Sequence, residues 1–151
     1  MPPLSHLSVF PFDNLTRILK SYISGLTSRE QGICYCSDCR KNSGSLFTYS
    51  FVFKNDDIKV TGTPKVIQKN ADSGNTIKNH FCDECGTPLY GTRINADGSP
   101  GQVTIVRAGV FDDLEMFNQL PPKAELYVGE RVSWLCPVEG AEQFVGMISL
   151  P

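Results

Sequence analysis

The sequence predicts an all-β domain built from small antiparallel sheets. Most of the chain after Cys34 falls into short segments that are rich in β-branched and aromatic residues, which suit the pleated surface of a sheet. Runs of Gly, Pro, Asn and Asp separate these segments, as at residues 61–64 and 71–75. Short strands joined by polar turns are typical of antiparallel β architectures.

These segments predict eight strands, at residues 46–53, 57–62, 64–70, 76–82, 87–94, 102–111, 124–129 and 132–138. Between the sixth and seventh strands, residues 112–120 have room for about one helical turn and little more.

The first 31 residues differ in character from the rest of the chain. Apolar residues between Leu15 and Leu26 recur at helical spacing, and Arg17 and Lys20 fall on the opposite face. We therefore expect one amphipathic helix in residues 1–31, followed by a zinc-binding β domain in residues 32–151.

Composition narrows the classes of function. The chain has 151 residues, enough for one domain with its own core. A formal charge of -2 argues against nucleic acid as a partner, and no apolar run approaches the roughly 18 residues of a membrane span. The N-terminus does not resemble a secretory signal, so we expect a reducing, cytoplasmic setting in which cysteines are thiols or metal ligands.

Five of the six cysteines form two clusters with metal-ligand spacing. Cys34, Cys36 and Cys39 form a CxCxxC motif, and Cys82 and Cys85 form a CxxC motif. Thiolates two or three residues apart on a turn can point at one cation, and for sulfur ligands this is most often zinc. The sixth cysteine, Cys136, has no partner at such spacing, so we expect it to lie in the core.

Two ligand assignments compete. In one, Cys34, Cys36 and Cys39 hold an open zinc whose fourth position takes water or substrate. In the other, Cys34 and Cys36 join Cys82 and Cys85 in a closed site. The open site indicates an enzyme, whereas the closed one indicates a zinc-stabilised binding or scaffold module without catalysis. The nearby His80 is a further candidate ligand.

The blocks CYCSDCRKNSGSLF, HFCDECGTPLY, IVRAGVFDD and PKAELYVGERVSWL resemble the glutathione-dependent formaldehyde-activating enzyme family, which includes centromere protein V. The resemblance covers about residues 32 to 147. It implies a β-tent fold and an open catalytic zinc held by Cys34, Cys36 and Cys39. It also matches Cys82 and Cys85 to half of a four-cysteine structural zinc site. The CxC pair that completes this second site in the family is absent before Cys34, so one zinc is expected and a second is in doubt.

The favoured function is a zinc-dependent carbon–sulfur lyase. Its substrate would be an adduct of glutathione, or of another small thiol, with an electrophile such as an aldehyde. Arg40 and Lys41 follow the ligand loop and are candidates to bind the substrate's carboxylates. Ser43 and Ser45 are candidates to bind it through their hydroxyl groups. The half-site at Cys82 and Cys85 leaves room for a homodimer.

Overall fold

The computed structural model describes residues 31–148 except 59, 61–62, 72–73 and 113. The helix expected in residues 1–31 therefore lies outside the described residues, apart from Gln31, which begins the first strand. The strands are β1 (Gln31–Cys34), β2 (Thr48–Lys54), β3 (Lys65–Asn70), β4 (Thr76–Phe81), β5 (Pro88–Ile94), β6 (Pro100–Arg107), β7 (Ala124–Leu126) and β8 (Glu142–Phe144). The helices are α2 (Ser37–Ser43) and α3 (Leu114–Gln119), with single 3-10 turns η2 (Asn55–Asp57), η3 (Ala108–Val110) and η4 (Val128–Glu130).

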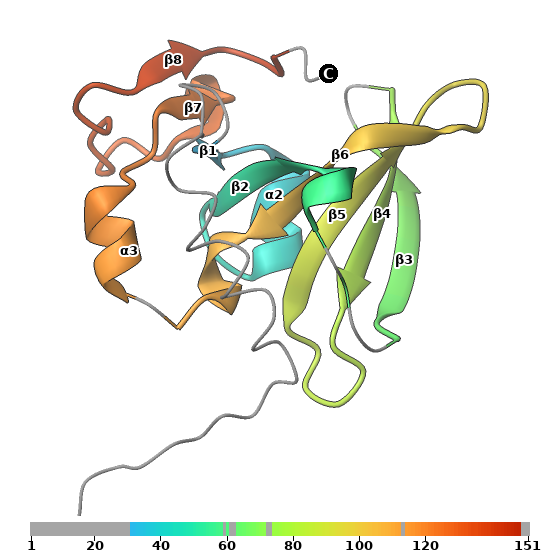
Figure 1. Cartoon of the computed structure of the whole chain (residues 1–151). Coiled ribbons are helices and arrows are strands. Elements are labelled where there is room, and N and C mark those ends of the chain that lie inside the picture. The colour runs from blue at the N-terminus through green and yellow to red at the C-terminus, as the bar shows by residue number, and fades with distance from the viewer. Residues whose placement is uncertain (1–30, 59, 61–62, 72–73, 113, 149–151) are drawn as a thin grey trace, which may run out of the picture.

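The all-β class is confirmed. The eight strands form one hydrogen-bonded sheet, in the order β3-β4-β5-β6-β2-β1-β7-β8, rather than several separate sheets (Figure 1). The pairs from β3 to β1 are antiparallel, as expected. The pairs β1–β7 and β7–β8 are parallel, because the chain returns to these positions through long connections and not through hairpins.

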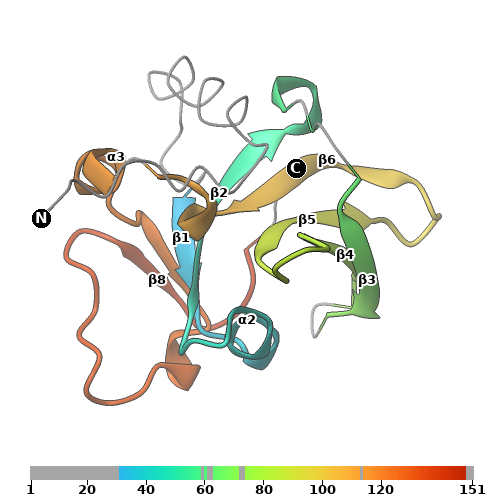
Figure 2. The same ribbon diagram turned by 90° about the horizontal axis from the view of Figure 1, so that it is seen from below.

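Strand β2 divides the molecule into two sides. Its residues alternate, so that Phe51 and Phe53 point to one face, while Thr48, Ser50 and Val52 point to the other. The two phenylalanines join a core that α3 and η3 cover, and Phe51 is fully buried. Figure 2 shows α2 and α3 on opposite sides of β1 and β2. The remaining core residues are Val106, Ala108, Phe111, Met116 and Leu120.

Two expected strands are wrong. In residues 57–62 the described positions form no strand, because the amide of Ile58 bonds to the carbonyl of Asn55 at 3.3 Å and closes a 3-10 turn. Residues 132–138 form turns, and their side chains do not enter the core: Trp134 is 70% exposed, and Cys136 is exposed where a core position was expected. Pro137, which has no amide donor, also disfavours a paired strand there.

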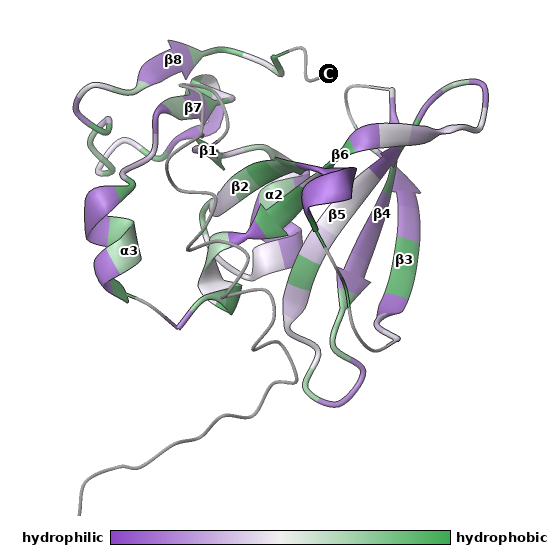
Figure 3. Ribbon diagram, in the orientation of Figure 1, coloured by the Kyte–Doolittle hydropathy of each residue, from purple (hydrophilic) through white to green (hydrophobic). Residues whose placement is uncertain are grey.

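Other expectations hold with shifted ends. The strand expected at 102–111 ends at Arg107 and continues as η3, while a short helix, α3, does form within 112–120. Strands β1 and β8 were not expected, since neither QGIC nor EQF has a strong strand pattern. Figure 3 shows an apolar centre in the otherwise polar edge strand β3, where Ile67 is 58% exposed. In the described part of the chain, no helix has the length and apolar character that crossing a membrane requires.

Candidate metal centre and adjoining cavity

The three cysteines of the CxCxxC motif come together where β1 ends and α2 begins. Cys34 is the last residue of β1, Cys36 is the N-cap of α2, and Cys39 lies inside the helix. The amide of Cys39 donates to the sulfur of Cys36 at 3.4 Å. All three sulfur atoms lie within 4.8 Å of one another. A strand end followed by a helical turn is therefore what aims three thiols at one point.

This donor set fits a soft metal ion. Zinc–sulfur bonds are about 2.3 Å long, so two sulfurs that share a tetrahedral zinc lie about 3.8 Å apart. The three sulfurs, all within 4.8 Å of one another, are near enough for one ion to bind them together. Within the described residues, no fourth His, Cys, Asp or Glu joins the group. The cluster could hold a metal ion and leave a position for another ligand.

The thiols share protons unevenly. Hydrogen bonds from Cys34 and then Cys36 lower the pKa of Cys39 to about 2, and Thr48 and the charge of Arg107 act in the same direction. Hydrogen bonds with Cys36 and then Cys39, together with burial, raise the pKa of Cys34. One thiolate is thus stabilised by its neighbours, which is the protonation state that metal ligation extends to all three.

Cys82 and Cys85 lie apart from this cluster. They sit in the turn between β4 and β5, where the amide of Gly86 donates to the carbonyl of Cys82 at 2.9 Å and Gly86 has a φ of 75°. The sulfur of Cys85 lies 3.0 Å from the hydroxyl of Thr87, and this contact lowers the pKa of Cys85. The structure thus builds the expected knuckle turn but does not bring it to Cys34 and Cys36, as the closed four-cysteine assignment requires.

His80 does not join either set of cysteines. Its ring stacks on Tyr90 with 4.2 Å between the ring centroids, and burial lowers the pKa of its imidazole. Its neighbour Asn79 faces the other side of the sheet, toward α2.

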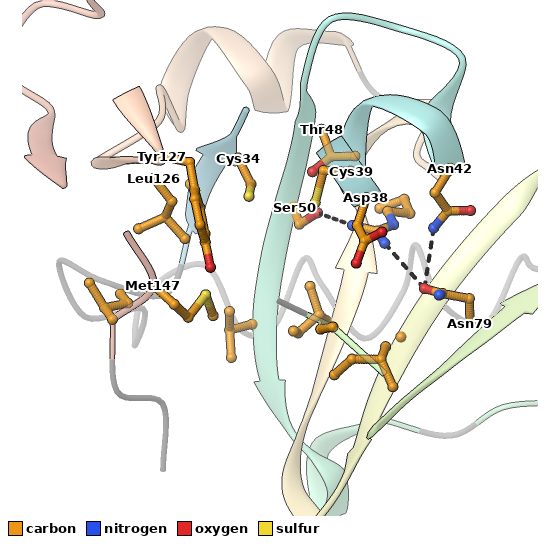
Figure 4. A pocket seen from close by; sticks show the side chains of 18 of the residues that line it. Cys34, Asp38, Cys39, Asn42, Thr48, Ser50, Asn79, Leu126, Tyr127 and Met147 are labelled. Atoms are coloured by element: carbon orange, nitrogen blue, oxygen red, sulfur yellow. Dashed lines mark hydrogen bonds between the residues drawn. The ribbon is translucent and has the colours of Figure 1, made fainter. Parts of the chain in front are cut away.

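A cavity of about 160 Å³ adjoins the three-cysteine cluster. Cys34 and Cys39 line it, whereas Cys36 does not. Figure 4 shows the side chains of Cys34 and Cys39 at the cavity, with Leu126, Tyr127 and Met147 on one side and Asn79 on another. A ligand in this cavity would lie directly against two of the three candidate metal ligands.

One wall of the cavity is polar and tied together by hydrogen bonds. Arg107 donates to the hydroxyl of Ser50 at 3.2 Å and to the side-chain oxygen of Asn79 at 3.4 Å. The same oxygen accepts from the side chain of Asn42 at 3.2 Å, which connects α2 to β4 (Figure 4). These bonds fix the guanidinium group beside the cysteines.

The two cations that line the cavity differ in their partners. Lys69 is paired with the carboxylate of Asp38, which links β3 to α2. Within the described residues, Arg107 donates hydrogen bonds to neutral acceptors, Ser50 and Asn79, and its charge also acts on the Cys39 thiol. A guanidinium group that is half-buried beside a cavity, and that pairs with no carboxylate in the described part of the chain, attracts anions such as thiolates and carboxylates.

The four residues predicted to bind substrate lie elsewhere. Arg40 donates to the carbonyl of Tyr35 at 3.3 Å and to the carboxylate of Glu130 at 3.5 Å. Lys41 is exposed, and the hydroxyl of Ser43 bonds to backbone carbonyls around the end of α2. Ser45 donates its amide to Ser43. None of the four lines the cavity, so their role in substrate binding stays a prediction.

Sequence reasoning missed Arg107 and Asn79. They lie 28 positions apart and meet because β4, β5 and β6 are neighbours in the sheet. One signal was available in the segment QVTIVRAGVF: a charged residue inside a long apolar strand pattern, which indicates a special environment.

The family model for "Glutathione-dependent formaldehyde-activating enzyme" matches residues 20–130, which include both cysteine motifs and Arg107. The chain belongs to this family. The match extends further toward the N-terminus than the resemblance read from the motifs, and it stops before residues 131–151.

Two curated relatives agree with this membership. A protein of Colletotrichum graminicola is 38% identical over 58 residues, which are 38% of this chain and 30% of the relative. A protein of Penicillium rubens is 40% identical over 67 residues, which are 42% of this chain and 32% of the relative. Both are provisionally named glutathione-dependent formaldehyde-activating enzymes. The alignments thus span about a third of each relative's length.

Proposed function

We propose that this protein is a zinc-dependent enzyme of the carbon–sulfur lyase type, acting on the adduct of a small thiol such as glutathione with an aldehyde. Membership of the formaldehyde-activating family supports the reaction class and the thiol substrate. The observation that carries the proposal is the group of three thiols, Cys34, Cys36 and Cys39, at the edge of a cavity. Free thiols as ligands suit the reducing conditions of the cytoplasm, which we propose as the location.

Each residue has a defined part in this proposal. Cys34, Cys36 and Cys39 would hold the zinc, which when bound supplies a Lewis acid with affinity for sulfur and alkoxide donors. Because Cys34 and Cys39 line the cavity, a zinc that they hold would lie against it. Arg107 supplies positive charge for the thiolate or a carboxylate of the substrate, held in place by Ser50 and Asn79.

The function is tested by measuring how fast the protein interconverts S-hydroxymethylglutathione with free glutathione and formaldehyde. NMR follows this exchange. Cys39→Ser should lose both zinc and catalysed exchange. Because changes to partners of metal ligands already cost about 10- to 100-fold, loss of a ligand should reduce the rate by roughly 100-fold or more. The matched control is Cys136→Ser, which alters an exposed cysteine outside the cluster and should keep full activity.

Metal analysis accompanies the assay. We expect about one zinc per chain in the natural protein and in Cys136→Ser, and far less in Cys39→Ser. Arg107→Gln should keep its zinc and raise KM for the thiol. A Cys39→Ser variant that retains full exchange activity would refute the proposed site.

A further inference from the structure

The cavity beside the cysteines has a second, apolar wall that the three-sulfur site does not explain. Strands β2, β4 and β6 contribute Val52, Ile77 and Ile105 to it, and Leu126, Met147 and Ile148 complete it from the C-terminal part of the chain. These six side chains are aliphatic. They come from five separate segments of the sequence that the fold brings around one space.

Side chains of the apolar wall are less buried than their neighbours on the same strands. On β2, Phe51 and Phe53 are 0% and 3% exposed, while Val52 between them is half-buried. On β6, Val106 is 1% exposed, while Ile105 is half-buried. The same two strands thus bury Phe51, Phe53 and Val106 on one face and leave Val52 and Ile105 of the other face in contact with a cavity. Apolar surface of this kind gains free energy when an apolar group covers it.

The size of the cavity limits what fills it. A hydroxymethyl group, the part that formaldehyde adds to a thiol, has only two heavy atoms and leaves most of about 160 Å³ empty. Peptide groups of a thiol such as glutathione would find no hydrogen-bond partners on an aliphatic wall. An engineered apolar cavity of about 150 Å³ in another protein binds benzene.

We propose that this cavity receives an apolar group about the size of a benzene ring, carried by the ligand that binds beside Cys34 and Cys39. The inference rests on the proposed function for the identity of that ligand, a thiol adduct. It adds that the electrophile supplies a bulky hydrophobic substituent, as an aromatic or branched aliphatic aldehyde does. Asn79 and Arg107 lie two residues along β4 and β6 from Ile77 and Ile105, on the same face of the sheet, and then border the polar part of the same ligand.

Gly91 provides a direct way to fill the cavity. It lies on β5, opposite Asn79 on β4 and Ile105 on β6, so a side chain added there points to the same face. A Cβ at Gly91 would meet the Asn79 oxygen at 3.5 Å and the Ile77 methyl at 3.7 Å, both ordinary contacts. Gly91→Val should therefore fold and occupy the space, with Gly91→Ala as a milder form.

The matched control is Gly109→Val. Gly109 is exposed in η3 and does not line the cavity, and a Cβ there meets nothing within 4 Å. Neither glycine has a left-handed φ. The two variants add the same side chain inside and outside the cavity.

The first measurement needs neither metal nor turnover. Toluene is titrated into ¹⁵N-labelled protein while the amide signals of Gly91 and Ile105 are followed by NMR. Both signals should shift in the natural protein. The Ile105 signal should also shift in Gly109→Val, and it should not shift in Gly91→Val. If toluene moves neither signal in the natural protein, the apolar site is refuted.

The second measurement compares S-benzylglutathione with S-methylglutathione by calorimetry. We expect the benzyl compound to bind at least about tenfold more tightly, and Gly91→Val to remove most of that difference while S-methyl affinity stays within about twofold. Equal affinities in the natural protein would refute the inference while leaving the proposed function intact. If neither compound binds but toluene still shifts both amides, the apolar site stands and the proposed thiol-adduct function fails.

Discussion

Glu125 is a fully buried carboxylate that ties the C-terminal part of the chain to the candidate metal centre. Its side chain accepts hydrogen bonds from the Tyr35 hydroxyl at 2.5 Å, the Val138 amide at 3.0 Å, Arg131 at 3.3 Å and Gln143. Tyr35 stands between two of the candidate metal ligands. A buried charge with four donors is stable, but removing it leaves those donors unsatisfied.

Because of Glu125, the free energy of unfolding should fall as the pH becomes acidic. Burial opposes its ionisation, but the bonds from Tyr35, Val138 and Gln143 and the charge of Arg131 together lower its pKa below the ordinary 4.5. A depressed carboxyl pKa contributes stability that is fully present above the unfolded pKa and is lost as pH falls through the folded one. Glu125→Gln should therefore cost about 3 kcal/mol at neutral pH.

Urea unfolding between pH 3 and pH 7 measures this effect. The gap in free energy of unfolding between the natural protein and Glu125→Gln should narrow as pH drops below about 4.5. The exposed Glu139→Gln is the control and should show no such gap. A gap that stays constant across this range would mean that ionised Glu125 does not stabilise the fold.

At the scale of elements, the contact of β1 with β7 sets the position of Cys34. A Cβ at Gly32 would lie 2.9 Å from the carbonyl oxygen of Ala124, closer than such atoms normally approach. Gly32→Ala should therefore push β1 from β7 and destabilise the protein by about 1–3 kcal/mol. It should also weaken metal binding, because Cys34 ends the same strand.

Gly91→Ala is the comparison, since its Cβ meets only ordinary contacts. Urea unfolding and zinc competition with a chelator measure both variants. Similar losses of stability in the two would indicate that the narrow β1–β7 spacing has no special cost.

The elements also show what could be predicted from the sequence. Hairpin strands such as β4 and β5 were found because their own residues carry the signal and their partner is next in sequence. β1 and β8 have weak strand patterns of their own, and both pair in parallel with β7 across long connections. Local sequence does not encode such pairing. The cysteines were found for the same reason as the hairpins: their spacing is local. Arg107 and Asn79 were not, since only the strand order brings them together.

Over the whole molecule, one sheet serves two purposes on its two faces. The face with Phe51 packs against α3 and η3 and forms the closed core. The other face carries α2 (Figure 2). The cysteine cluster and the cavity lie on this face too. α2 has seven residues, none of them buried, so bonds such as Asn42 to Asn79 and the cluster itself hold it in place. Stability and the proposed chemistry therefore reside largely in different layers.

This separation predicts the response to metal removal. A module stabilised mainly by zinc unfolds when a chelator is added. Here the core around Phe51 does not include the cysteines, so chelation should lower Tm by roughly 10 °C and keep a cooperative transition. Amides of α2 should exchange with solvent faster, whereas those of β5 and β6 should be nearly unchanged.

Calorimetry, far-UV circular dichroism and hydrogen exchange measure these effects. Chelator added to Cys39→Ser is the control, and it should cause no further change. Loss of the whole β signal on chelation would instead favour a zinc-stabilised scaffold without catalysis, because the metal would then support the core itself.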